Sequence, residues 1–301
     1  MSADSIERAD TFPDPRISLD SFAHHQIRVA AVTGGGSGIG RAVAHGLATA
    51  GYRVAILGPR MDTLTESAQA HPDITPFSLD VGDARQCDAV FGEVEKQLGP
   101  VDILIANAAV HPRLNFLDQS PSSFEATIQV NVLGVANAVR AVLPGMLARK
   151  VGRVIVVGSL ADQSPRAGDC AYAVSKGAVH ALVRGIATEI ERVRYPNVLA
   201  NEFNPGRTRT GMSASGQPPE AVYPMIQALI DQPSGGAHGR MFVMGREVRP
   251  HEGVRRMLLR RLRLGPELLR LSPTRSGRAG ARLLAAVTSL DWRPTSSRRS
   301  H

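Results

Sequence analysis

The sequence predicts an α/β fold in which one doubly wound parallel sheet is covered by helices on both faces. Seven short apolar runs alternate with longer segments of helical periodicity, the pattern of successive strand–helix units. The first apolar run leads directly into a glycine-rich turn, Gly34 to Gly40. A chain of 301 residues is long enough for one such domain with an appendage at each end.

The expected strands are short apolar runs: Ile27–Thr33, Tyr52–Leu57, Thr75–Leu79, Val101–Ala106, Val154–Gly158, Val198–Phe203 and Met241–Met244. Longer periodic segments between them are the expected helices: Arg41–Ala50, Asp62–Gln69, Ala84–Leu98, Ser122–Arg149, Ala171–Arg194 and Glu220–Ile230.

Residues 27–250 are expected to form this single domain. Residues 1–26 carry five acidic residues and lack an apolar core, so we interpret them as a flexible arm rather than a signal peptide. No apolar run approaches 18 residues, which argues against a membrane span. The two cysteines, Cys87 and Cys170, offer neither a disulfide framework nor a metal-ligand cluster. The chain is therefore expected to be soluble, cytoplasmic and without a metal site.

The net charge of +8 comes from the C-terminal end of the chain. Residues 251–301 hold 12 arginines and no lysine against three acidic residues, whereas the other 250 residues hold 23 basic and 24 acidic groups. This basic extension shows helical spacing over Val254–Leu264, and its composition beyond Ser272 favours disorder. It either docks on the domain or on a second copy, which we favour, or lies on an anionic membrane surface, or contacts nucleic acid, for which no specific motif is present.

One helical segment carries a tyrosine and a lysine that together suit proton transfer. Tyr172 and Lys176 are four residues apart, so a helix places both side chains on one face. Ser159 ends a buried strand 13 residues before the tyrosine. A phenol has a pKa near ~10, so it needs a nearby cation to act as a general acid or base at neutral pH. Lys176 can supply that cation.

The glycine-rich turn predicts a dinucleotide site. Glycines allow a tight turn from strand to helix, and backbone N–H groups at the helix N-terminus bind a pyrophosphate. The spacing is GxxxGxG, with Gly34, Gly38 and Gly40 at its fixed positions. Because the turn follows the first strand of an alternating chain, it indicates a Rossmann-like domain.

These motifs together resemble the short-chain dehydrogenase/reductase family over roughly Arg28 to Gly245. The resemblance is carried, in the family's order and spacing, by Thr33-Gly34-x-x-x-Gly38-Ile39-Gly40, Asp80-Val81, Asn107-Ala108-Ala109, Asn131-Val-x-Gly134, Ser159, Tyr172-x-x-x-Lys176 and Asn204-Pro205-Gly206-x-x-x-Thr210. It implies an NAD(P)-dependent oxidoreductase that interconverts a ketone and a secondary alcohol, and a homo-oligomer, either dimer or tetramer.

The resemblance also implies a role for each motif. Tyr172 would be the general acid/base, Lys176 would lower the tyrosine pKa and bind the nicotinamide ribose, Ser159 would bind the substrate oxygen, and Asn131 would hold a water beside the lysine. The cofactor-binding residues would be Thr33, Gly34, Gly36, Ser37, Gly38, Ile39, Gly40, Arg60, Asp80, Val81, Asn107, Ala108, Ala109, Tyr172, Lys176, Pro205, Gly206, Thr208 and Thr210.

Structural interpretations compete with several of these roles. Asn131 could bridge a helix kink, and Ser159 could cap a helix. Asp80 is either a turn residue or an acceptor for the adenine amino group, and Asn107 could tie neighbouring strands together. Ala109 stands where the family usually has glycine, a change that we expect the site to tolerate.

The end of the second strand favours NADP(H) over NAD(H). NAD-preferring members carry an acidic residue there to bind the ribose 2′-hydroxyl, and this chain has Gly58. Arg60 lies two residues further on and offers a guanidinium for a 2′-phosphate. Pro59 occupies the position where the basic residue usually stands, and Ser37 adds no second cation, so Arg60 could instead be solvated.

The substrate pocket is expected between two variable segments. The first, Arg207 to Pro233, would contribute an apolar lining of Met212, Tyr223, Met225 and Ile226. The second is the loop after Asn107, in which His111 either binds substrate or faces solvent.

Two further points stay open in the sequence. Glu202 lies in an apolar strand and needs a partner if it is buried, and the sequence names none. An alternative function also remains, a dehydrogenase-like binding or regulatory protein that acts through its basic tail.

Overall fold

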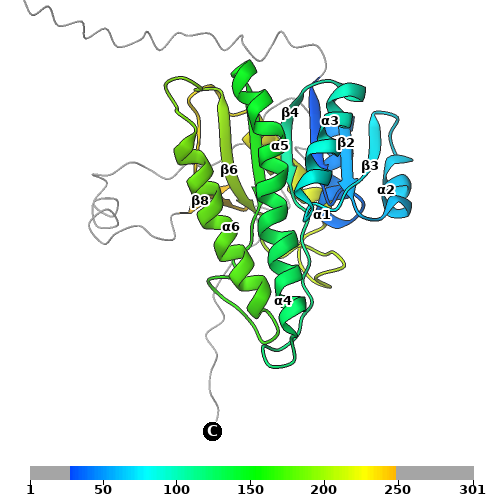
Figure 1. Ribbon diagram of the computed structural model, residues 1–301, viewed down its shortest axis with the longest axis vertical. Helices are drawn as coiled ribbons and strands as arrows, with labels where there is room; N and C mark the ends of the chain where they lie inside the picture. Colours follow the sequence, from blue (N-terminus) through cyan, green and yellow to red (C-terminus); the bar gives the residue numbers. More distant parts are fainter. Residues whose placement is uncertain (1–27, 249–301) are drawn as a thin grey trace, which may run out of the picture.

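The structure is a computed structural model that describes residues 28–248 (Figure 1). The flexible arm predicted at 1–26 and the basic extension predicted at 251–301 lie outside the described residues. The predicted boundaries of the domain, 27 and 250, also lie outside the described residues and stay predictions.

One eight-stranded sheet forms the centre of the molecule, with strand order β3-β2-β1-β4-β5-β6-β7-β8. The first seven strands are parallel, and β8 is antiparallel to β7. The strands are β1 Val29–Thr33, β2 Arg53–Gly58, β3 Ile74–Ser78, β4 Val101–Ala106, β5 Gly152–Val157, β6 Val198–Asn204, β7 Met241–Val243 and β8 Arg246–Val248.

Helices cover both faces of the sheet, as the doubly wound prediction requires. They are α1 Gly38–Thr49, α2 Met61–Ala68, α3 Ala84–Leu98, α4 Pro121–Ile128, α5 Gly134–Arg149, α6 Cys170–Glu189 and α7 Tyr223–Ile230. Side chains of α3, α5 and α6 form one apolar core with one face of the sheet, and side chains of α1, α2 and α7 form a second core with the other face. Figure 1 shows α5 and α6 side by side in front of the sheet.

The sequence prediction was wrong in two places that affect the topology. It missed β8, because a three-residue edge strand after Met244 and Gly245 is too short for a clear apolar pattern. Met244 and Gly245 both have positive φ, 46° and 78°, and they make the tight turn between β7 and β8. The predicted helix Ser122–Arg149 is also not one regular α-helix.

A π-helical turn, Gln129–Leu133, interrupts that long helix. It inserts extra backbone at Asn131, whose side chain is fully buried and bonded to the loop after β4. Single π-helical turns within α-helices occur frequently at functional sites. The stretch Pro121–Arg149 is long and apolar enough to span a membrane by length and composition, but α5 lies on the sheet and supplies core residues such as Val139 and Val142.

A buried arginine fixes the edge of the sheet at the N-terminal ends of β5 and β6. Arg153 is 1% exposed, and its guanidinium donates to the carbonyl oxygens of Gly152, Asn197, Ile230 and Gln232 and to Asn197 Oδ1. Burial lowers the pKa of Arg153 to about 9. These bonds join β5, β6 and the end of α7 on the side opposite the strand ends that carry the sequence motifs.

Candidate active site

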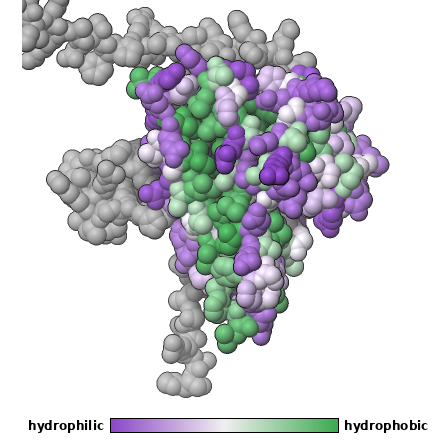
Figure 2. Space-filling view, in the orientation of Figure 1, coloured by the Kyte–Doolittle hydropathy of each residue, from purple (hydrophilic) through white to green (hydrophobic). Residues whose placement is uncertain are grey.

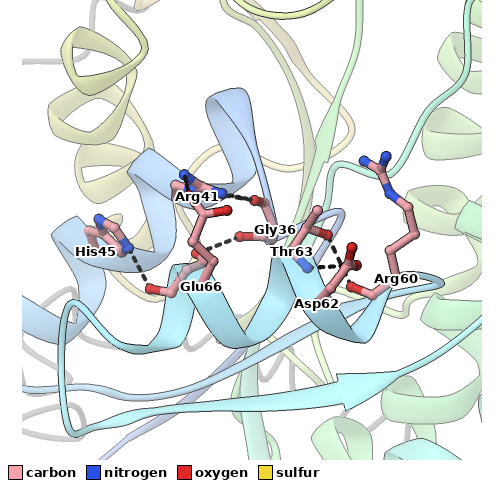
Figure 3. Close-up of polar contacts among 9 residues, drawn as sticks. Gly36, Arg41, His45, Arg60, Asp62, Thr63 and Glu66 are labelled. Atoms are coloured by element: carbon pink, nitrogen blue, oxygen red, sulfur yellow. Dashed lines mark hydrogen bonds and ion pairs between the residues drawn. The ribbon is translucent and has the colours of Figure 1, made fainter.

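The glycine turn after β1 is held in shape by side chains of the next helices. Gly34 has φ of 67°, and a Cβ on Gly40 would lie 2.2 Å from the Gly34 oxygen, so neither position accepts a side chain without a shift. Ser67 donates to the Gly35 oxygen at 3.0 Å, and Arg41 donates to the Gly36 oxygen at 2.6 and 2.9 Å. Figure 3 shows Arg41 between Gly36 and Glu66. Sequence reasoning missed Arg41, which follows Gly40 directly.

The N-terminus of α1 has no side-chain cap. Ser37 occupies the N-cap position, and its side chain makes no capping hydrogen bond. The first N–H groups of a helix have no partner within the helix, and they bind anions well. The backbone oxygens of Gly35 and Gly36 accept hydrogen bonds from the side chains of Ser67 and Arg41. This arrangement fits the phosphates of a dinucleotide.

The point where the sheet order reverses lies between β1 and β4. Thr33 Oγ1 accepts hydrogen bonds from the backbone N–H groups of Asn107 and Ala108, at 3.0 and 3.1 Å. The Asn107 side chain donates to the Thr33 oxygen at 3.0 Å. Asn107 therefore does tie two strands together, as the structural interpretation predicted. Ligands of such sheets bind at this crevice.

Local hydrogen bonds between side chains and nearby backbone groups shape the turn at Asp80 and the predicted loop after β6. Asp80 Oδ1 accepts from the Gly82 N–H at 2.8 Å, so the carboxylate stabilises this turn, and its role toward the adenine stays a prediction. Gln217 donates to the Pro205 oxygen at 2.7 Å, and Thr208 is 5% exposed within the same loop. Thr210 differs, because it lies against Gly38 of the glycine turn.

The predicted catalytic residues come together at the carboxyl ends of β5 and β6. Ser159 and Tyr172 share a side-chain hydrogen bond, and Lys176 Nζ lies 5.6 Å from the centroid of the tyrosine ring. Burial raises the pKa of Tyr172, and the bond to Ser159 acts in the opposite direction. Burial lowers the pKa of Lys176 to about 8, against the charge of Glu202. The Ser159 hydroxyl also accepts from the Ala161 N–H, so it stabilises its own turn.

Asn131 joins three elements of the site from the π-helical turn. Its Oδ1 accepts from the Val110 N–H at 2.7 Å, and its Nδ2 donates to the Val110 oxygen at 2.9 Å and to Ser175 Oγ at 3.0 Å. Ser175 in turn donates to the Tyr172 oxygen at 2.7 Å. The predicted bridging role at a helix irregularity is confirmed. Ser175 was missed, although it lies between the tyrosine and the lysine in the sequence.

His111 is not solvent-facing. Its ring stacks on Tyr172 with 4.3 Å between the ring centroids, and its Nε2 lies 2.9 Å from Asp169 Oδ1. Burial lowers the pKa of His111, although Asp169 opposes that change. The imidazole therefore forms a wall beside the phenol. Asp169 was missed because it stands in a loop immediately before α6.

The predicted apolar lining after β6 is partly wrong. Ile226 is fully buried in the core between α7 and the sheet, and Tyr223 lies directly over Gly46 of α1. A 340 Å³ hollow borders Gly38, Gly46 and Tyr223, and none of the predicted catalytic residues lines it. Met212 is 38% exposed, and its oxygen accepts from Arg113 of the His111 loop, so Met212 joins the two predicted pocket segments.

Arg60 occupies the N-cap position of α2, near the glycine turn, and its side chain makes no capping hydrogen bond. Thr63 donates to the Arg60 oxygen, and the Thr63 side chain lies 3.0 Å from the Cβ position of Gly36. Figure 3 shows the Arg60 guanidinium pointing away from Asp62 and Thr63. The Arg60 side chain is exposed. Its environment therefore leaves the guanidinium accessible to a ligand near the end of β2.

Comparisons with known proteins agree with this fold. The family model described as short chain dehydrogenase matches residues 28–221. A short chain dehydrogenase of Pseudocercospora fijiensis is 36% identical over 71% of this chain and 72% of its own length. The 2,3-dihydro-2,3-dihydroxybenzoate dehydrogenase of Bacillus subtilis is 33% identical over 62% of this chain and 72% of its length.

Two more distant matches extend the comparison. The 3alpha-hydroxysteroid dehydrogenase of Mediterraneibacter gnavus is 28% identical over 72% of this chain and 89% of its length. The crystal structure of gox2181 superposes with a TM-score of 0.66 at 24% identity, covering 73% of this chain and 94% of that one. The chain belongs to the short-chain dehydrogenase family. It is an NAD(P)-dependent oxidoreductase of the class that acts on alcohol and ketone groups.

Proposed function

We propose that this oxidoreductase interconverts a ketone and a secondary alcohol with NADP(H), and that Tyr172 is its general acid/base. The observation that supports this most directly is the meeting of Ser159, Tyr172 and Lys176 at one sheet edge. Tyr172 Oη gives a proton to the substrate oxygen in reduction and removes one in oxidation. Ser159 Oγ donates to the same oxygen where negative charge develops.

Lys176 makes the tyrosine usable at neutral pH. Burial by itself raises the pKa of Tyr172, which disfavours the phenolate. A protonated ammonium 5.6 Å from the ring centroid favours the phenolate and lowers the cost of proton transfer. His111 stacks on the phenol and limits its movement.

The cofactor would be held by the uncapped start of α1 and by the sheet edge around it. The N–H groups near Ser37 and Gly38 would bind its phosphates, and Lys176 would bind the nicotinamide ribose. The cofactor supplies the hydride when it is bound. Arg60 would bind the 2′-phosphate of NADP(H), because its guanidinium is exposed beside the glycine turn.

We also propose that the protein is a cytoplasmic homo-oligomer. Figure 2 shows hydrophobic surface along the face that carries α5 and α6 in Figure 1. Val174 of α6 is 50% exposed, and Leu133, immediately before α5, is 44% exposed. Apolar area of this kind on a soluble protein is typical of a subunit contact.

Cofactor choice is tested by titrating the protein with NADPH and NADH while following nicotinamide fluorescence. NADPH should bind more tightly, and Arg60→Ala should weaken NADPH binding roughly tenfold or more while leaving NADH unchanged, since a charge-assisted bond contributes about 1.5–3 kcal/mol. Arg184→Ala removes an exposed arginine from α6 and serves as the control. Equal loss of both cofactors in Arg60→Ala would overturn the assignment of Arg60.

The reaction is tested with a panel of ketones and secondary alcohols. Tyr172→Phe should lower turnover by about 10²–10⁴-fold while cofactor binding remains, because only the proton donor is lost. Tyr195→Phe, a partly buried tyrosine beyond the end of α6, provides the control. Absence of binding by either cofactor would favour the alternative function, a binding or regulatory protein that acts through its basic tail.

A further inference from the structure

The helix that carries Tyr172 and Lys176 presents a third side chain on the same face. His180 follows Lys176 by four residues, as Lys176 follows Tyr172, so the helix α6 aligns all three. Lys176 is 4% exposed and His180 is 7% exposed. The stripe formed by Tyr172, Lys176 and His180 on this helix face therefore continues from the sheet edge into the protein interior.

Glu202 is the partner that the sequence could not name. It lies in β6, is 1% exposed, and its Oε2 is 2.7 Å from His180 Nδ1. Because an ionised carboxylate only accepts hydrogen bonds, the His180 ring donates through Nδ1. This bond fixes the carboxylate beneath α6.

The end of β5 leaves room for this carboxylate only because residue 158 is glycine. A Cβ on Gly158 would lie 2.0 Å from Glu202 Oε1. The preceding residue, Val157, accepts a hydrogen bond from Lys176 Nζ at 2.9 Å through its oxygen. The ammonium and the carboxylate thus lie against consecutive residues, Val157 at the end of β5 and Gly158 directly after it.

The charges around Lys176 come from two elements. Glu202 faces it from β6, and Tyr172 and His180 share its own helix. Burial of an ammonium disfavours its charged form, and a buried carboxylate nearby offsets that cost. The negative charge of Glu202 raises the pKa of Lys176, against burial, which lowers it to about 8.

We propose that Glu202 and His180 are positioning residues, in which the Glu202 carboxylate, oriented by His180, keeps the buried Lys176 ammonium protonated beneath Tyr172. This inference rests on the proposed function, because it matters for catalysis only if Lys176 assists Tyr172. The working unit is then the stripe Tyr172-x-x-x-Lys176-x-x-x-His180 with Glu202 opposite it. The two added residues act on the reaction through Lys176.

Lysine NMR tests this proposal without turnover. The chain contains three lysines, Lys96, Lys150 and Lys176, so protein labelled with [¹³Cε]-lysine gives three signals, and Lys176→Arg assigns the one of interest. Glu202→Gln removes the charge and keeps the shape. Its Lys176 titration midpoint should fall by about one pH unit, the lower end of the effect of a nearby opposite charge. A midpoint equal to that of the unsubstituted protein would overturn the proposal.

Two further variants make the NMR test specific. Glu247→Gln is the matched control, because Glu247 is a buried carboxylate of the same sheet, paired with Arg240, and is not among the groups that shift Lys176. It should leave the Lys176 midpoint unchanged. His180→Gln should lower the midpoint in the same direction as Glu202→Gln, and it gives a second test if Glu202→Gln does not fold.

The pH dependence of turnover separates this inference from the proposed function. The alkaline limb of kcat/KM should move about one pH unit lower in Glu202→Gln, because Lys176 loses its proton earlier. Unchanged limbs together with an unchanged NMR midpoint would refute the positioning role. A shifted NMR midpoint in a protein that turns over no carbonyl or alcohol would instead refute the proposed function and leave the charge coupling intact.

Discussion

Replacing Asn131 by alanine should destabilise the protein as well as impair the reaction. The side chain makes three hydrogen bonds, two to the backbone of Val110 and one to Ser175. Each contributes about 1 kcal/mol net, so the full set amounts to about 3 kcal/mol. Val110 is 38% exposed, so water can replace part of its two bonds, whereas Ser175 is fully buried. The expected loss in the free energy of unfolding is therefore about 2–3 kcal/mol.

Urea denaturation followed by circular dichroism measures this loss. With a denaturant dependence of about 2 kcal/mol per molar urea, the midpoint should fall by about 1–1.5 M. Asn137→Ala is the matched control, because Asn137 lies in α5 and its side chain donates to the Val81 oxygen at 2.9 Å, with a longer contact to Gly82. Its midpoint should fall by about half a molar or less.

One result would refute this reasoning. If Asn131→Ala keeps the urea midpoint of the unsubstituted protein while turnover falls, the three hydrogen bonds do not contribute to the free energy of unfolding. Asn131 would then act only in the reaction. A loss in both measurements, with cofactor binding retained at low temperature, would agree with a residue that holds the His111 loop against α6.

Three more predictions follow from charges and burial. In the reduction direction, kcat/KM should fall as the pH rises through about 8, because Lys176 then loses the proton that supports Tyr172. A profile of kcat/KM that stays flat to about pH 9.5 would contradict this. Arg153→Met should lower the free energy of unfolding, measured in urea, by about 3 kcal/mol or more, because the five hydrogen bonds that the guanidinium donates are lost at once. A loss below about 1 kcal/mol would be inconsistent with this reasoning. Asp169→Ala should raise KM more than it lowers kcat, because the His111 ring loses its hydrogen-bond partner while Tyr172 keeps Ser159. Steady-state kinetics with unchanged KM would argue against a pocket wall there.

The fold was predictable because its main signals are local. The central parallel strands β1, β4 and β5 are buried on both faces and read as short apolar runs, and the glycine turn marks where the first helix begins. The strand β8 escaped prediction because its three residues pair only through a turn set by Met244 and Gly245. Likewise, α-helical periodicity cannot reveal the extra backbone at Asn131, which depends on contacts with a loop 21 residues away.

The candidate site was predictable where residues stand at a fixed spacing on one helix. It was much less predictable where the conformation of a loop determines which residues lie together. Tyr172 and Lys176 share a helix face, so their proximity follows from sequence alone. The stacking of His111 on Tyr172 depends instead on how the loop after β4 lies against α6, and no periodicity encodes it. Glu202 could be recognised as needing a partner, but naming His180 required knowing that β6 lies beneath α6.

The π-helical turn determines the direction in which the Asn131 side chain points from the helix axis. Each residue advances an α-helix by about 100°, so one residue removed from the 29-residue stretch Pro121–Arg149 would let it run as a regular helix. Such a helix would satisfy its own backbone well, yet every side chain on one side of the deletion would point elsewhere relative to the sheet. The deletion would make the helix regular but would separate Asn131 from Val110 and Ser175. The length of this stretch is therefore constrained more tightly than its composition.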